Sequence, residues 1–194
     1  THYTRKHLTH EIIMGWMEQK IKFDIDSGTN EILDEIIMYL GAVFTDIYNL
    51  RPNIISCSSS SKTKFSAHII ITNYSVYNHI EAQWFTEQVK QLLPEILHQH
   101  VDWGVNKSTQ NFRIAGSTKP DGRKKQIPEG YTLEDTLITH TISCIRLSKK
   151  ADYCIHSSIH CMNSELEPIL KYVDAEIYQY YKTSNNMFLF NRIS

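Results

Sequence analysis

Two short segments of the chain place an apolar residue at every second position. Residues 21–26 and 65–71 both show this alternation, and both are rich in isoleucine and phenylalanine. Because successive side chains of a strand point to opposite faces, each segment is predicted to be a β-strand with one apolar face. The other face of the first strand carries Asp24 and Asp26. Residues 54–57 predict a further short strand between the two.

The polar face of the second strand is unusual in composition. It begins with Lys64, Ser66 and His68, which all point the same way if Phe65, Ala67, Ile69 and Ile71 form the apolar face. A cation, a hydroxyl and an imidazole are costly to bury without partners. They suit a surface that binds a polyanion such as a triphosphate. Taken alone, Ser66 is more often a packing residue and His68 a half-buried core histidine.

Helical periodicity predicts two amphipathic helices. Apolar residues recur at helical spacing from Ile32 to Tyr48, after the turn and cap signal 27–30 and before the stop signal of Pro52. A second helix is predicted over 79–98, with Pro94 expected to kink or break it.

The remaining elements follow weaker patterns. We expect a helix over 7–20, strands over 100–104, 111–116 and 136–147, and a terminal helix over 165–182. In the strand at 111–116, Phe112 and Ile114 are expected to face inward and Asn111 and Arg113 outward. The core order β-α-β-β-α-β-β predicts an α/β or α+β domain with a mixed sheet.

Composition narrows the class of protein. The chain has 194 residues, of which 41% are hydrophobic, enough for the core of one domain. We therefore expect 1–194 to be a single domain, cut from a longer protein because no initiator Met is present. The sequence has no apolar run long enough to span a membrane, so we expect no membrane partner. Four unevenly spaced cysteines favour an intracellular reducing compartment.

The distribution of charge is more informative than its total. The net charge is −1, but six Lys or Arg residues lie within 107–125 against one acid, Asp121. The run 123–125 is expected to form a solvated loop, and a phosphate-facing patch is the alternative.

Three acids form a possible metal site. Asp24 and Asp26 share one face of a strand, and Asp102 lies at another strand end. Each alone is more often an exposed or capping residue. Together, three carboxylates can hold two Mg²⁺ or Mn²⁺ ions that activate a hydroxyl and stabilise a leaving phosphate oxygen. With Lys64, Ser66, His68, Arg113 and Lys119 as phosphate ligands, these residue types match nucleotidyl transfer from a nucleoside triphosphate.

These segments resemble a known family. Asp24-Ile-Asp26, Lys64-Phe-Ser66-Ala-His68 and Val101-Asp102 are similar to the three signature motifs of archaeo-eukaryotic primases and primase-polymerases. Asn111-Phe112-Arg113 and Ser117-Thr118-Lys119 are similar to segments of eukaryotic primase-polymerases and of primases of large DNA viruses or plasmids. The resemblance covers about residues 20–125. Asp26 stands where some members have Glu.

The resemblance implies a bilobed catalytic core with an RNA-recognition-like palm. It implies metal binding by Asp24, Asp26 and Asp102, catalysis by these acids and His68, and nucleotide contacts from Lys64, Ser66, His68, Arg113 and Lys119. The implied activity is that of a DNA primase or DNA-directed polymerase, with template, primer and nucleoside triphosphates as partners and a helicase in the same or a partner chain.

Two alternative functions remain open beside this interpretation. A metal-dependent nuclease also uses clustered carboxylates, and a non-catalytic nucleic-acid-binding module of a replication protein needs neither metal nor triphosphate. Structural zinc is not expected, because the late Cys and His residues lack a Cys-x₂-Cys spacing. These residues are Cys144, Cys154, His156, His160 and Cys161.

Overall fold

The computed structural model describes residues 8–61, 64–147, 178–182 and 188–192. The chain divides into two compact units, 1–147 and 148–194. All the predicted site residues lie in the first unit. In the second unit, β7 (Tyr178–Lys182) pairs antiparallel with β8 (Phe188–Arg192). That 1–194 form a single catalytic domain stays a prediction.

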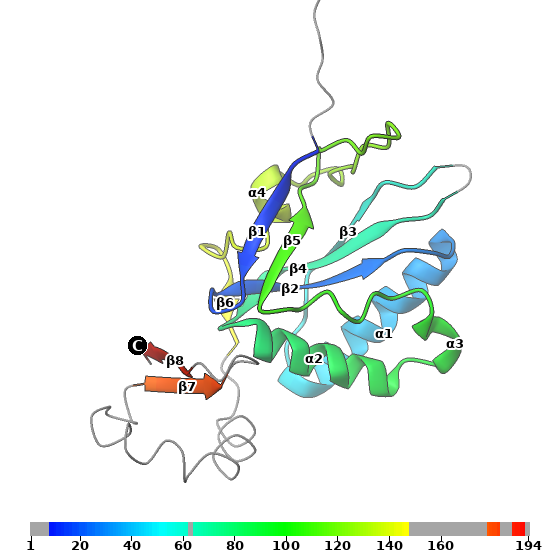
Figure 1. Ribbon diagram of the computed structural model, residues 1–194. Coiled ribbons are helices and arrows are strands. Elements are labelled where there is room, and N and C mark those ends of the chain that lie inside the picture. Colours follow the sequence, from blue (N-terminus) through cyan, green and yellow to red (C-terminus); the bar gives the residue numbers. More distant parts are fainter. Residues whose placement is uncertain (1–7, 62–63, 148–177, 183–187, 193–194) are drawn as a thin grey trace, which may run out of the picture. The chain divides into compact units, whose positions relative to one another are not determined.

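A four-stranded sheet is the centre of the first unit (Figure 1). β4 (Ala67–Val76) lies between β2 (Gln19–Ile25) and β3 (Ile54–Ser58), antiparallel to both. The short strand β6 (Ile145–Arg146) pairs parallel with the end of β4. The sheet is therefore mixed and the fold belongs to the α+β class, as the sequence predicted.

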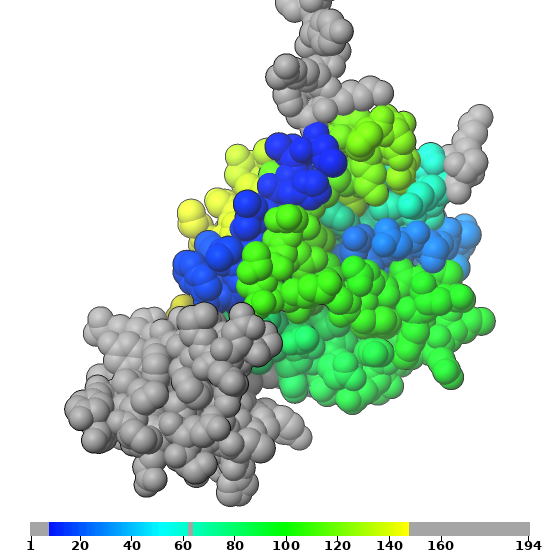
Figure 2. All heavy atoms as spheres, in the orientation of Figure 1, coloured from blue at the N-terminus to red at the C-terminus, as the bar shows by residue number. Residues whose placement is uncertain are grey.

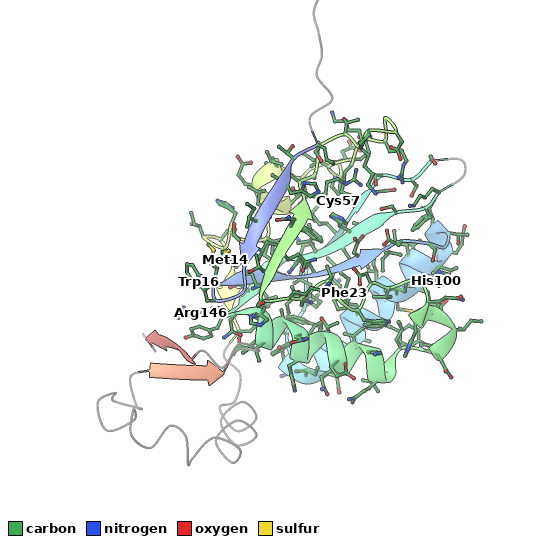
Figure 3. All side chains as sticks on the ribbon, viewed as in Figure 1. Met14, Trp16, Phe23, Cys57, His100 and Arg146 are labelled. Carbon is green, nitrogen blue, oxygen red and sulfur yellow. The ribbon has the colours of Figure 1, made fainter. Side chains whose placement is uncertain are left out.

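Helices cover one face of this sheet. α1 (Asn30–Tyr48) and α2 (His79–Leu92) bury their apolar stripes against the isoleucine and phenylalanine side chains of β2 and β4. Phe23 lies on the helix side of β2 (Figure 3). Its ring meets that of Phe85 of α2 edge to face, with the ring centroids 6.4 Å apart. Both helices are confirmed, and so is the break at Pro94, because a separate turn, α3 (Glu95–His98), follows it.

A second, smaller sheet lies over the opposite face. β1 (His10–Met14) pairs antiparallel with β5 (Thr109–Arg113), and the side chains of the two strands lie side by side on the surface in Figure 2. A second apolar cluster fills the space between the sheets, with Cys57 among its members. β5 occupies part of the strand predicted over 111–116.

Four sequence predictions are wrong. Residues 10–14 form a strand where a helix over 7–20 was expected, because β1 finds its partner in β5, about a hundred residues later. The segment 100–104 contributes one bridge, Val101 to Ile25, instead of a strand. Most of 136–147 is not a strand: the short helix α4 (Leu133–Thr136) precedes it, and Ile142 is 90% exposed. Of the terminal helix predicted over 165–182, residues 178–182 are strand β7 and the rest lies outside the described residues.

No helix in the described part of the chain is both long and apolar enough to cross a membrane.

Candidate active site

The pairing of β2 with β4 brings the two polar rows together. Asp24 lies directly opposite His68 in the antiparallel register. On β4, Ala67, Ile69 and Ile71 pack into the helix-side core, whereas Ser66 and His68 point to the other face, as the alternation predicted. β4 is not flanked by acid-bearing segments on both edges, because its neighbours are β2, which carries Asp24, and β3. The second acid-bearing segment, Val101 and Asp102, pairs with the other edge of β2.

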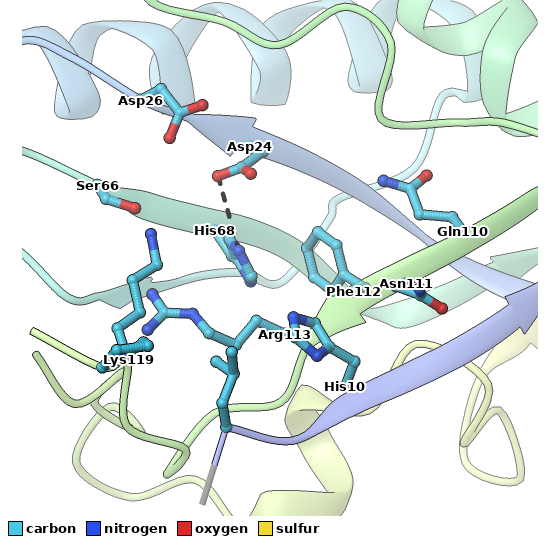
Figure 4. Close-up of a pocket in the computed structure, with 12 residues that line it drawn as sticks. His10, Asp24, Asp26, Ser66, His68, Gln110, Asn111, Phe112, Arg113 and Lys119 are labelled. Carbon is cyan, nitrogen blue, oxygen red and sulfur yellow. Dashed lines mark ion pairs between the residues drawn. The ribbon is translucent and has the colours of Figure 1, made fainter. Parts of the chain in front are cut away.

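A cavity of about 370 Å³ opens on this polar face. β1, β2, β4, β5 and the loop after β5 all contribute to its wall. In Figure 4 the carboxyl groups of Asp24 and Asp26 lie on one side, Arg113 and Lys119 on the other, and Ser66 and His68 between them. Six of the eight predicted site residues therefore line one pocket. Asp102 and Lys64 are not among its lining residues.

Asp24 lies in an unfavourable setting for negative charge. Oδ1 of Asp24 is buried and has no hydrogen-bond partner among the described residues. Burial, together with the nearby carboxylates of Asp26 and Asp102, raises the pKa of Asp24 to about 6, against the opposing effect of Lys125. A buried carboxylate oxygen without a donor is a site at which a cation would be stabilised.

Asp102 contacts Asp24 directly through a backbone hydrogen bond. Its N–H donates to the carbonyl of Asp24 (2.9 Å), which aligns the segment with β2. Its side chain is exposed, and Oδ1 accepts a hydrogen bond from the N–H of Gly104 (2.9 Å). Within the described ranges, no three Asp, Glu, His or Cys side chains come together as a metal-binding group. Metal binding by all three acids stays a prediction.

His68 is held in a fixed orientation inside the pocket. Its ring is 5% exposed and stacks on Phe112, with centroids 3.9 Å apart. Nε2 lies 3.6 Å from Oδ1 of Asp24. Burial, and next the positive charges of Lys125 and Arg113, lower the pKa of His68 well below its ordinary value. His68 is therefore a neutral imidazole at neutral pH, and its contact with Asp24 is not a full ion pair.

A neutral His68 predicts a measurable pH dependence. Since the unfolded chain binds a proton at this residue near pH 6.5 and the folded chain does not, stability falls as the pH drops below about 6.5. We expect the Cε1–H chemical shift of His68 in NMR spectra to keep the value of a neutral imidazole over the pH range in which ordinary histidines become protonated. On acidification, the free energy of unfolding measured with denaturant is expected to fall less for the His68→Gln variant than for wild type. An NMR titration of His68 with a midpoint near 6.5 would contradict this assignment.

The cations reach the pocket from the end of β5 and from the loop that follows it. Arg113 is 6% exposed, and its guanidinium donates to Oγ of Ser59 and to the carbonyl of Arg123 (3.5 Å). The expectation that Arg113 faces outward is wrong, because the side chain turns into the pocket between the two sheets. Lys119 lines the pocket directly. Lys64 is exposed, but its charge is near enough to contribute to the lowered pKa of Lys119.

Ser66 is positioned by the serine-rich turn. Its backbone N–H donates to Oγ of Ser60 (3.2 Å), and its carbonyl accepts from the N–H of Ser59 (2.8 Å). The side chain is almost fully buried and faces the cavity (Figure 4). The turn before β4 thus fixes Ser66 and, through Ser59, also Arg113.

Two buried lysines near the site were not predicted. Lys22 lies on the acidic face of β2, where Nζ donates to Asn106 (2.9 Å) and Gln19 (3.2 Å). Lys125 is 0% exposed, so the solvated loop expected for 123–125 is wrong at this residue. The sequence does contain a signal for Lys22, because this residue lies two positions before Asp24 and therefore on the same face of β2. No sequence signal separated Lys125 from its exposed neighbour Lys124.

Comparison with known proteins gives one group of relatives. No model of a known protein family matches the chain. It is 33% identical over 228 residues to a "Putative helicase/primase complex protein" from a Kenyan pig isolate of African swine fever virus, covering 95% of this chain and 22% of that protein. The protein of the same name from the Badajoz strain is 31% identical over 238 residues, with the same coverage.

The chain spans about a fifth of the length of the curated relatives it matches. The similarity extends over nearly all of this chain. It relates the chain to viral proteins that are named for a helicase/primase complex.

Proposed function

We propose that this chain is the catalytic part of a DNA primase or DNA-directed polymerase, a template-directed nucleotidyltransferase. One observation carries the proposal. Asp24 and Asp26 face Arg113 and Lys119 across a single pocket, with Ser66 and His68 between the acids and the cations. Carboxylates beside a cationic clamp are what transfer from a nucleoside triphosphate requires, since the phosphates need cations and the attacking hydroxyl needs activation.

The residues divide into two groups by chemistry. Arg113 presents a planar donor set suited to two phosphate oxygens at once, and Lys119 adds a point charge. The Ser66 hydroxyl and the neutral His68 imidazole add hydrogen-bond donors that carry no charge of their own. Lys64, exposed at the edge of the same charge cluster, adds longer-range attraction for the triphosphate.

The acid pair fits a divalent cation. Oδ1 of Asp24 is buried and accepts no hydrogen bond from the described residues, and the pKa of this carboxyl is raised. Both features favour a cation between Asp24 and Asp26. Asp102 would join them by exchanging its hydrogen bond with Gly104 for the metal. When bound, Mg²⁺ or Mn²⁺ would lower the pKa of an attacking hydroxyl and stabilise charge on the phosphate oxygens.

The relatives support the biological setting of this proposal. Their name assigns them to a helicase/primase complex. We infer a role in DNA replication for this chain, with a DNA template and primer as substrates and a helicase in the same or a partner chain. The resemblance of the motifs to primase-polymerases, including an RNA-recognition-like palm, agrees with this role.

Primer extension tests the proposal directly. The 194-residue chain is incubated with a primed DNA template, nucleoside triphosphates and Mg²⁺ or Mn²⁺. We expect extension that depends on metal and template, and we expect it to be stronger than synthesis without a primer, because no zinc module is predicted in this sequence. Lack of extension with both metals on every template would refute the polymerase assignment.

The same material separates the two rival functions. A metal-dependent nuclease would shorten the labelled primer and would not need tight binding of a nucleoside triphosphate. A non-catalytic binding module would bind DNA equally well after Asp24→Ala and would never extend a primer. The cationic wall formed by Arg113 and Lys119 favours the polymerase over the nuclease, because it supplies charge for a triphosphate.

A further inference from the structure

Lys125 is a buried lysine whose ammonium group makes no hydrogen bond to the described residues. Its side chain is 0% exposed, and Nζ has no hydrogen-bond partner in the described part of the chain. An ammonium group has three donors, and leaving all of them unmet in the interior is costly. Lys124, the preceding residue, is exposed and could have carried the same charge at little cost.

The backbone holds Lys125 in place. Its N–H donates to the carbonyl of Ser117 (3.0 Å), and its carbonyl accepts from the N–H of Gly116 (2.7 Å). The next residue, Gln126, donates to the carbonyl of Ser58 at the end of β3 (2.8 Å). The loop is therefore fastened at its base, and the burial of Lys125 follows from a fixed backbone.

The surroundings of Lys125 are those of the pocket. The groups that act on its charge include Arg113, Asp24 and Lys119, three lining residues of the pocket, together with Cys57. Two of these three pocket residues are cations. Without an anionic ligand, burial and the repulsion of Arg113 and Lys119 lower the pKa of Lys125 to about 7, offset only in part by Asp24 and Cys57. The ammonium form is therefore only partly populated at neutral pH, and an anion in the pocket favours it.

We propose that Lys125 is a further phosphate-positioning residue, a buried positive charge that acts with Arg113 and Lys119 on the polyphosphate of a nucleoside triphosphate. This inference rests on the proposed function and deepens it. Lys125 is not itself a lining residue, so its charge acts from behind the wall of the pocket. Such a charge is effective there, because the protein interior screens it less than water does. A polyanion in the pocket supplies the negative charge that the protein leaves unmatched.

Calorimetric binding of dATP and dAMP to the whole chain tests this role. Lys125→Met is expected to weaken dATP binding about tenfold to a hundredfold, the range of a charge-assisted interaction. Binding of dAMP should change much less, because dAMP lacks the polyphosphate. Lys125→Arg restores the charge and should recover part of the affinity for dATP. The matched control, Lys124→Met, removes an exposed charge and should stay within about twofold of wild type.

Four results would contradict the inference on Lys125 or distinguish its failure from that of the proposed function. A folded Lys125→Met variant that binds dATP within about twofold of wild type overturns the inference. An equal loss for dATP and dAMP also overturns it, because that pattern indicates a structural role. If wild type binds no dATP, the inference and the proposed function both fail. If dATP binding depends on Lys125 but no primer is extended, the inference stands and the polymerase assignment fails.

A second measurement tests the inference even if the Lys125→Met variant does not fold. The Lys125 Nζ signal of ¹⁵N-labelled wild type, assigned by its loss in Lys125→Arg, is followed while dATP is added. We expect this signal to shift more than that of Lys124. An unchanged Lys125 signal at saturating dATP contradicts the inference.

Discussion

Asp24→Asn is expected to abolish primer extension while leaving the chain folded. The substitution keeps the size of the side chain and removes the negative charge that the proposed metal site needs. Loss of such a site costs several kcal/mol of transition-state stabilisation, so we expect a rate at least about a thousandfold lower. Single-turnover extension of a labelled primer measures the change.

The same substitution should not destabilise the protein. Because burial raises the pKa of Asp24 to about 6, the ionised carboxylate costs folding free energy at neutral pH. The folded chain holds this proton up to about pH 6, whereas the unfolded chain releases it near 3.8. Stability therefore falls as the pH rises from about 4 to about 6, and Asp24→Asn removes that loss. We expect the variant to gain up to about 2 kcal/mol at pH 7, partly offset because Lys125 loses an attractive charge.

Asp34→Asn is the matched control for Asp24, since Asp34 is exposed on α1. It should leave extension and unfolding unchanged. Full primer extension by a folded Asp24→Asn variant would show that the acid pair is not the metal site. Loss of stability at pH 7 would show that the Asp24 carboxylate is better satisfied in the folded chain than its geometry indicates.

Arg113→Lys is expected to weaken the use of nucleoside triphosphates even though it keeps the charge. Ser59 and the carbonyl of Arg123 anchor the guanidinium at the wall of the pocket, and a lysine ammonium cannot contact these partners and two phosphate oxygens together. We expect kcat/KM for the incoming nucleotide to fall about 30-fold to 100-fold, mainly through a higher KM. Steady-state extension at varied nucleotide concentration gives both constants.

Two variants sharpen the Arg113 result. Arg51→Lys, at an exposed position, should leave kcat/KM unchanged. Ser59→Ala removes one anchor of the guanidinium and should produce a smaller loss of the same kind, without changing any proposed phosphate ligand. An Arg113→Lys variant with an unaltered KM for nucleotides would mean that Arg113 serves the fold alone.

Much of the fold can be predicted from local patterns of apolar and polar residues. The apolar stripe of α1, the break at Pro94 and the alternation on β2 and β4 each depend on residues close together in sequence. Their periodicity reflects burial on one face, so the sequence was sufficient. The same alternation placed Asp24, Ser66 and His68 on faces that the strand pairing then joined.

The elements for which the sequence prediction is wrong depend on contacts between segments that lie far apart in the chain. The segment 10–14 is too short for its period to separate helix from strand, and it becomes a strand only because β5 pairs with it. In 136–147 the apolar residues predict a strand, but Ile142 is exposed, and the capping box of Thr132 and Asp135 starts a short helix before it. This cap is a local signal that the sequence already contains.

The sequence by itself determined which chemical groups this protein offers, namely acids, cations and a histidine at strand spacing, the set that we propose serves nucleotidyl transfer. Only the tertiary structure decided which of these groups meet. It turned Arg113 inward onto Ser59, left Lys64 exposed and Asp102 bonded to Gly104, and buried Lys125 beside Asp24. The physical reason is that residue type follows from the sequence, whereas burial and charge neighbours depend on the packing of two sheets whose strands lie far apart in the chain.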